Sequence, residues 1–117
     1  LWGVWDVPTE GIMAAVRTAE RGDVKITTED LGLNVAIAMA QNSGVAGLGA
    51  QRPYDQGVAE ATLAAYGLIG KDAPPYVALG ALPVHHGNLL EAWQDIYHQE
   101  VPEPIQESFV ECTPPTN

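Results

Sequence analysis

The side chains best suited to binding a ligand in this chain follow three short apolar runs. Trp5 and Asp6 follow the first run, Asp30 follows the second, and Gln51 and Arg52 follow the third. An aromatic ring can stack on the CH face of a cyclic polyol, and carboxylate and amide groups can hydrogen-bond its hydroxyls. We therefore predict that these residues form a binding site for a neutral polyhydroxylated ligand.

All of these residues except Gln51 also have a structural alternative. Trp5 could belong to the core, and Asp6 or Asp30 could cap the helix that follows it. Gln51 has no evident local role after its Gly- and Ala-rich run. Arg52 could clamp a carboxylate or form a surface ion pair, and the sequence favours neither alternative.

No catalytic or metal-binding set accompanies this predicted site. Glu29 beside Asp30 could suggest the paired carboxylates of glycoside hydrolysis, but neighbouring strand-end residues seldom form that pair, and no nucleophile with its base is visible. His85 and His86 are adjacent, with no third ligand nearby, which indicates a loop. The run 44–49 lacks the Lys and Ser or Thr of a phosphate-binding loop. We therefore expect a binding protein that is not an enzyme and that uses no metal or cofactor.

An alternation of strand and helix patterns positions the predicted site. Strand–helix–strand order predicts an α/β fold with a parallel sheet flanked by helices. In such sheets ligands bind outside the carboxyl ends of the strands, which is where the predicted site residues fall. The expected strands are 1–5 (buried), 24–28 and 45–50, and the helices that follow them begin near Pro8, near Val35 after a capping Asn34, and near Asp55.

The second half of the chain is less regular. Its first helix, expected over 55–68, is rich in small residues, which suggests tight contact with a sheet. A fourth strand is expected over 76–84, where Gly80 and Pro83 favour an edge or a bend. Asn88 could cap a last helix. The packing residues of that helix would include Trp93, Ile96 and Tyr97.

The composition limits the partners of the chain. Its 117 residues are 46% hydrophobic, which suits a packed core in one domain or in part of one. The net charge of −10, with only five Lys and Arg, argues against nucleic acid and anionic membranes as partners. The single cysteine, Cys112, cannot form an internal disulfide. The sequence shows no signal peptide and no run long enough for a membrane helix. Because the chain starts without Met inside an apolar run, we expect a fragment whose N-terminal part is missing.

Several motifs resemble the C-terminal part of the type I periplasmic sugar-binding proteins, the solute receptors of ABC importers. This family is related to ribose-binding proteins and to the effector domains of LacI-type repressors. The most specific motif is Ala50-Gln51 followed by Pro53-Tyr54 and Gly57, and the resemblance extends from about Gly3 to Pro102. The other matching motifs are Val4-Trp5-Asp6, Gly11, Asp23-Val24 leading to Asp30, Pro83-Val84, Asn88-Leu89 and Trp93.

The resemblance implies two α/β lobes that close around one sugar. Residues 1–51 would form part of the C-terminal lobe, 52–105 would hold a hinge crossing and the remainder of the second lobe, and 106–117 would be a tail. Asp30 and Gln51 match binding positions of the family. Trp5 and Asp6 fall on an Asn-Asp pair, so Trp5 is a departure that favours a stacking contact.

The resemblance also implies partners and a location. The expected ligand is a monosaccharide or a related small solute, the expected partner is the permease of an ABC transporter, and the expected location is the periplasm or, as a lipoprotein, the cell surface. The alternative is the effector-binding domain of a LacI-type transcriptional regulator, which the acidic composition disfavours. A chain with part of each lobe would expose sheet edges, so we expect self-association as a dimer or by swapping of elements.

Overall fold

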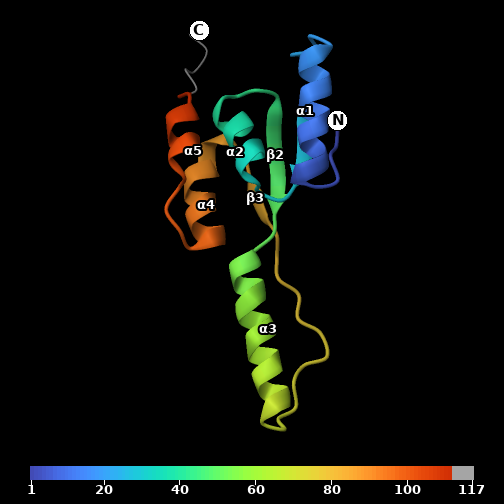
Figure 1. Ribbon diagram of the computed structural model, residues 1–117, viewed down its shortest axis with the longest axis vertical. Coiled ribbons are helices and arrows are strands. Elements are labelled where there is room, and N and C mark those ends of the chain that lie inside the picture. The colour runs from blue at the N-terminus through green and yellow to red at the C-terminus, as the bar shows by residue number, and fades with distance from the viewer. Residues whose placement is uncertain (112–117) are drawn as a thin grey trace.

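The computed structural model describes residues 1–111 and has the α/β fold expected from the sequence (Figure 1). Cys112 and the rest of the expected tail, 113–117, lie outside the described residues. The elements in chain order are α1 (Asp6–Thr18), β1 (Ile26–Glu29), α2 (Leu33–Ala40), β2 (Val45–Ala50), α3 (Pro53–Leu68), β3 (Leu82–Val84), a 3-10 turn η1 (His86–Asn88), α4 (Leu89–Tyr97) and α5 (Glu103–Ser108).

The sheet is mixed and has the order β1-β2-β3. Strands β1 and β2 are parallel as predicted, but β3 runs antiparallel to β2, with Leu82 opposite Ala50 and Val84 opposite Leu48. The expectation of a wholly parallel sheet was therefore wrong. The chain returns to the sheet at the carboxyl end of β2, where it left, so β3 can only run back along β2. Pro83 lies in this edge strand, where a missing N–H is tolerated.

The first apolar run is not the buried strand that the sequence suggested. It makes a single parallel bridge, Trp2 to Thr27, in which Gly3 N donates to Thr27 O (2.8 Å) and Thr27 N donates to Leu1 O (2.9 Å). Trp2 is 61% exposed and Trp5 is 49% exposed. This run stays at the surface because no described residue packs beyond it.

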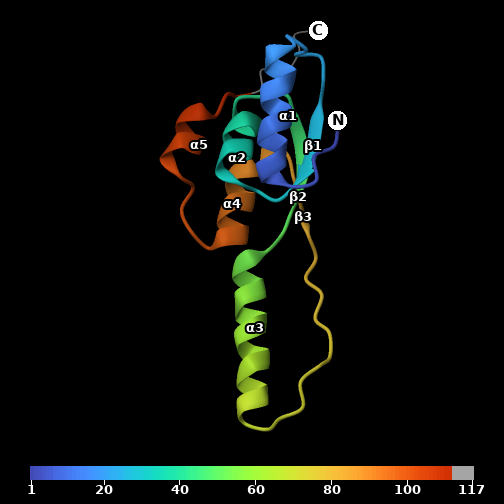
Figure 2. The same cartoon turned by 45° about the vertical axis from the view of Figure 1, so that its right-hand side comes forward.

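The core lies on one side of the sheet, beneath α1, α2, α4 and α5 (Figure 2). Alternation along β1 buries Ile26 and Thr28 and leaves Thr27 and Glu29 exposed. Helix α2 is apolar on most of its surface and sits at the centre of the core. The other side of the sheet, which we call the bare face, carries no helix among the described residues. The fully or nearly fully buried core residues include Val35, Met39, Val84, Leu89, Ile96 and Ile105.

Residues 53–81 form an arm that projects from this core (Figures 1 and 2). It consists of α3 and the extended segment that returns to β3. Helix α3 has no buried residue, so the predicted tight contact with a sheet was wrong. The molecule measures 61 × 26 × 26 Å, and its radius of gyration is 17.5 Å. A compact domain of this length would have a radius of gyration of about 13 Å.

Two other expectations about the second half differ from the structure. Of the strand expected over 76–84, only Leu82–Val84 is a strand, because 76–81 has no other strand beside it. Helix α5 reaches Ser108, inside the expected tail of 106–117, and Val110 N donates to Ala40 O (3.0 Å). The assignment of 1–51 and 52–105 to two lobes stays a prediction, although β3, α4 and α5 pack on the same core as α2.

Candidate functional site

Asp30 directly follows β1, as the sequence predicted. It lies on the side of the sheet where β1 and β2 end, which we call the carboxyl edge. Its amide donates to Gly49 O (3.0 Å), which extends the pairing of β1 with β2 by one residue. Its φ of 65° is left-handed, a conformation that Asp tolerates better than most residues. The chain then turns at once, so that Leu31 enters the core with 2% exposure and α2 begins at Leu33.

Asp6 reaches the same edge from the first turn of α1. It is the first residue of that helix, and its Oδ1 accepts a hydrogen bond from Val7 N (2.8 Å). A methyl group on Gly32 would overlap the Asp6 carboxylate, so this carboxylate lies directly over the backbone that opens α2. A negative charge at the start of a helix interacts favourably with the unpaired N–H groups there. This gives Asp6 a structural role beside its predicted ligand contact.

Burial and neighbouring negative charges raise the pKa of the Asp30 carboxyl above its usual value. The largest cause is burial, followed by the charges of Asp6 and Glu29, and a hydrogen bond with the Gln51 side chain lowers the pKa in opposition. None of the charges that act on the pKa of Asp30 is positive. A carboxylate kept in such surroundings costs stability, and arrangements of this kind concentrate at functional sites.

Tyr97, the last residue of α4, closes this edge of the sheet. Its hydroxyl donates to Leu31 O at 2.7 Å, and its ring packs against Trp93 with 4.5 Å between centroids. Burial raises the pKa of the Tyr97 hydroxyl, and the charges of Asp6 and Asp30 raise it further. The sequence predicts Tyr97 only as a packing residue, because its hydrogen-bond partner lies 66 positions away along the chain.

The side chains of Gln51 and Arg52 have different hydrogen-bond partners. The exposed Gln51 side chain is the one that hydrogen-bonds Asp30. The Arg52 guanidinium bonds Asp95 Oδ2 at 2.7 Å and Asp55 Oδ2 at 3.2 Å, and hydrogen bonds to Asp95 and then Asp55 raise its pKa. The structure thus contains the ion-pair alternative for Arg52, and its role as a ligand contact stays a prediction.

Trp5 lies at the N-cap position of α1, next to Asp6, and its carbonyl accepts a hydrogen bond from Thr9 Oγ1 (2.7 Å). Thr9 also bonds the Thr28 hydroxyl (2.8 Å), which ties the start of α1 to β1. The half-exposed indole is therefore held close to the site through its backbone. The structure brings together Asp6, Asp30 and Gln51, with Trp5 adjacent and Tyr97 added.

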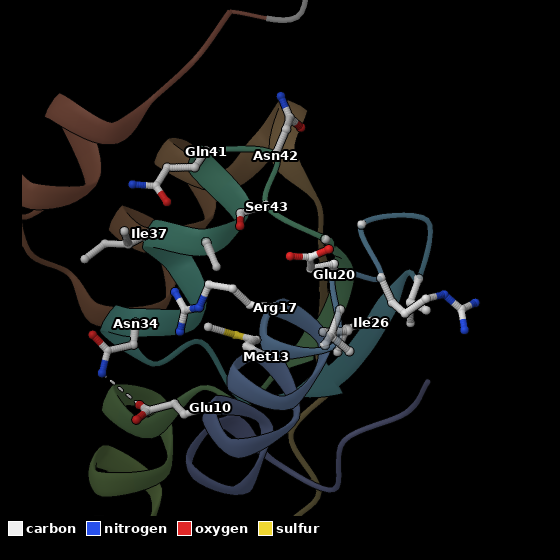
Figure 3. A pocket seen from close by; sticks show the side chains of 16 residues that line it. Glu10, Met13, Arg17, Glu20, Ile26, Asn34, Ile37, Gln41, Asn42 and Ser43 are labelled. Carbon is white, nitrogen blue, oxygen red and sulfur yellow. Dashed lines mark hydrogen bonds between the residues drawn. The ribbon is translucent and has the colours of Figure 1, made fainter.

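Of two hollows compared in the described part of the chain, the larger lies away from these carboxylates. It has a volume of about 710 Å³ and lies between α1 and α2, with Met13, Arg17 and Gly44 in its lining (Figure 3). Its residues around 22–26 and 42–44 lie at the amino ends of β1 and β2. The smaller hollow, of about 290 Å³, includes Gln51 and Arg52 at the base of the arm. The carboxyl edge is the better candidate site because Asp6, Asp30 and Gln51 come together there, although the hollow between α1 and α2 is larger.

Within residues 1–111, no group of three or more His, Cys, Asp or Glu side chains is arranged to hold a metal ion. His86 Nε2 lies 3.2 Å from Ala40 O, and its ring packs on Phe109, in keeping with a structural loop. In the same part of the chain, no helix combines the length and the apolar character needed to cross a membrane.

Comparison with known proteins agrees with this fold. No family model and no curated protein sequence matches the chain. A solved structure, an ABC sugar transporter subunit from Rhodobacter sphaeroides 2.4.1, matches with a TM-score of 0.64 and 25% sequence identity. The match covers 72% of this chain but only 30% of that one. The chain thus has an α/β fold that corresponds to part of a periplasmic-binding-protein fold.

Proposed function

We propose that this chain is part of the solute-binding component of an ABC importer and that its ligand is a sugar. The observation that carries the proposal is the Asp30 carboxylate, held with a raised pKa beside Asp6 and Gln51 where ligands bind in α/β sheets. Two carboxylates and an amide can accept hydrogen bonds from several hydroxyls at once. The likeness to a sugar transporter subunit supports the same ligand class.

The proposed mechanism is closure of two lobes around the sugar. Residues 51–53, which connect β2 to the arm, are the proposed hinge, and a sugar that binds the closed form better would shift the population toward it. The closed form would then engage the membrane permease, which places the protein outside the cytoplasm. The net charge of −10 fits this role better than that of a regulator that works on nucleic acid.

The exposed apolar surfaces support self-association of the isolated chain. Trp2 on the bare face and Leu68, Ile69 and Tyr76 on the arm are each more than 60% exposed. Exposed apolar patches mark interaction sites in folded proteins. The arm and the bare face of the sheet are the proposed contacts of a dimer or of swapped elements.

A thermal-shift panel tests sugar binding. The chain is heated with neutral pentoses, hexoses and deoxyhexoses, with sugar acids as a separate arm, and Asp30→Ala is compared with Asp23→Ala. Asp23 is exposed and pairs with Arg21 at the surface, so it is a matched acidic control. The proposal expects one neutral sugar to raise the melting temperature of the wild type and of Asp23→Ala but not of Asp30→Ala. A response to sugar acids alone would contradict a neutral ligand, and no response at all would contradict binding by this chain.

A further inference from the structure

Tyr97 lies at the carboxyl edge of the sheet, near Asp6 and Asp30. It ends α4, and His98 then takes a left-handed φ of 51°, so the chain turns away at this point. The Tyr97 side chain is half-buried and points back toward α2, where its hydroxyl donates to Leu31 O at 2.7 Å. This bond joins α4 to the connection between β1 and α2, which carries Asp30.

The carbonyl that Tyr97 holds belongs to Leu31, the residue after Asp30. Leu31 lies between the left-handed Asp30 and Gly32, the N-cap position of α2, which has an extended ψ of 159°. The Leu31 side chain is anchored in the core with 2% exposure. The turn is therefore fixed at two points, by the Leu31 side chain and by the Leu31 carbonyl, and a left-handed Asp persists only where surrounding structure holds it.

The Tyr97 ring is itself held in place. It packs on Trp93 with the ring planes at 42°, and Trp93 is only 8% exposed. A hydroxyl on a fixed ring can set the position of its acceptor, because little side-chain freedom remains to be lost.

We propose that Tyr97 is a positioning residue of the candidate site. Its hydroxyl holds the Asp30–Leu31 turn, and the turn holds the Asp30 carboxylate close to Asp6 and Gln51. The inference deepens the proposed sugar site, but the arrangement exists in the ligand-free chain and can be tested there.

The charged groups that act on the pKa values of Asp30 and Tyr97 support a position of Tyr97 close to the Asp30 turn. Asp6 from α1, Glu29 from the end of β1 and Tyr97 from α4 surround Asp30, and Gln51 approaches from the end of β2. The charges of Asp6 and Asp30 both act on the pKa of the Tyr97 hydroxyl, which indicates that they lie near it. If the turn moved outward, Asp30 would gain water and separate from Asp6.

The first test is Tyr97→Phe, which removes only the hydroxyl. The pKa of the Asp30 carboxyl is measured by carbon NMR titration in the ligand-free chain. We expect it to fall toward the ordinary Asp value, with shifted amide signals for Asp30 and Leu31. Tyr66→Phe on the arm is the matched control and should change none of these signals. An unchanged Asp30 pKa with unchanged amides in Tyr97→Phe would overturn the proposal.

The second test measures the pKa of the Tyr97 hydroxyl in a variant of Asp30. It does not depend on the folding of Tyr97→Phe. Asp30→Asn removes a negative charge beside Tyr97, so the pKa of the Tyr97 hydroxyl should fall toward the ordinary Tyr value, whereas Asp23→Asn should leave it unchanged. An identical hydroxyl pKa in Asp30→Asn would show that the two side chains are not neighbours in solution and would overturn the proposal. Neither test needs a sugar, so a negative sugar panel and a negative result here are separate failures.

Discussion

At the scale of single residues, Asp30 combines three features that each oppose folding. It has a left-handed backbone, it is partly buried, and it faces the negative charges of Asp6 and Glu29. The pKa of its carboxyl is raised, so the ionised form is less favourable in the folded state than in the unfolded one. The proposed sugar, which would hydrogen-bond this carboxylate, would account for a carboxylate in this place.

Asp30→Asn is therefore expected to stabilise the chain at neutral pH. Because the folded-state pKa is raised, the favourable contribution of protonated Asp30 is complete below the unfolded pKa and is lost as pH rises through the folded value. At pH 7 the neutral amide should gain from a few tenths to about 1 kcal/mol, the range for partly exposed charges. Urea unfolding at pH 7 and at pH 3 measures this, and the gain should vanish at pH 3. A destabilised Asp30→Asn at pH 7 would contradict the argument.

Gly32 is expected to leave room for the Asp6 carboxylate rather than to provide backbone freedom. Its φ of −75° suits any residue, but a side chain there would displace the Asp6 carboxylate. We expect Gly32→Ala to weaken sugar binding about tenfold or more, equivalent to about 1.4 kcal/mol. Titration calorimetry with the sugar selected by the panel measures this. Gly11→Ala, at a position in α1 where a methyl group meets nothing within 4 Å, is the control. Equal affinities of the two variants would argue against a role for Asp6.

The sequence could predict the grouping of Asp6, Asp30 and Gln51 because each directly follows an apolar run, and strand ends meet at one edge of a parallel sheet. It could not predict Tyr97, because that contact depends on how α4 packs against α2. Nor could it decide between the alternatives for Arg52, since Asp95 lies 43 positions away. Local patterns locate residues on elements, but contacts between distant elements require the fold.

At the scale of elements, α4 joins the site to the arm. Tyr97 contacts the turn after Asp30, while Asp95 bonds Arg52 at the base of the arm. His98 packs on Tyr54 with 4.2 Å between ring centroids, and its Nε2 lies 3.7 Å from Asp55 Oδ1. These contacts at the N-terminal end of α3 set the direction of a helix that has no buried residue.

Asp95→Asn is expected to loosen the arm without unfolding the core. Spin labels on Leu68→Cys and Glu91→Cys, with Cys112→Ser, would report the distance between the arm tip and α4. Loss of one ion pair should broaden the distance distribution. The effect on stability should be only about 0.2–1 kcal/mol, because Asp95 is 47% exposed. Asp23→Asn breaks a surface pair of the same 2.7 Å length elsewhere and should leave the distribution unchanged. Equal distributions in both variants would contradict a role for Asp95 in holding the arm.

The positions of helices and strands along the sequence could be predicted better than their burial and their neighbours. The third helix was expected over 55–68 and is found at Pro53–Leu68, yet the sheet contact expected for it is absent from the described structure. The first run was expected to be a buried strand and makes one bridge at the surface. Periodicity and turn residues act locally, whereas burial depends on what other chain lies alongside.

At the scale of the whole molecule, the chain is a small core with a bare sheet face and a projecting arm. The solved sugar transporter subunit that it resembles is covered over only 30% of its length. This chain thus spans less than a third of that protein's length, and the two lobes and the hinge between them stay a proposal. Apolar groups on the arm are exposed where a packed domain would bury them.

Self-association of the isolated chain is the expected outcome of this exposure. Burial of a large apolar side chain contributes about 1.5–3 kcal/mol, so a few such contacts from arm and bare face would favour a dimer. The net charge of −10 opposes association, and salt should strengthen it by screening that charge. Light scattering at low and high salt measures this, with Leu68→Ser and Ile69→Ser together as the weakened variant. A monodisperse monomer under both conditions would contradict the expectation.

We propose above that a sugar binds at the carboxyl edge of the sheet. An amide NMR titration of the chain with the sugar selected by the thermal-shift panel tests this directly. We expect the largest shifts on Asp6, Asp30, Gly32 and Gln51, and we expect Asp30→Asn to remove them. Shifts confined to the hollow between α1 and α2, around Arg17 and Gly44, would contradict binding at the carboxyl edge, as would a spectrum that does not change.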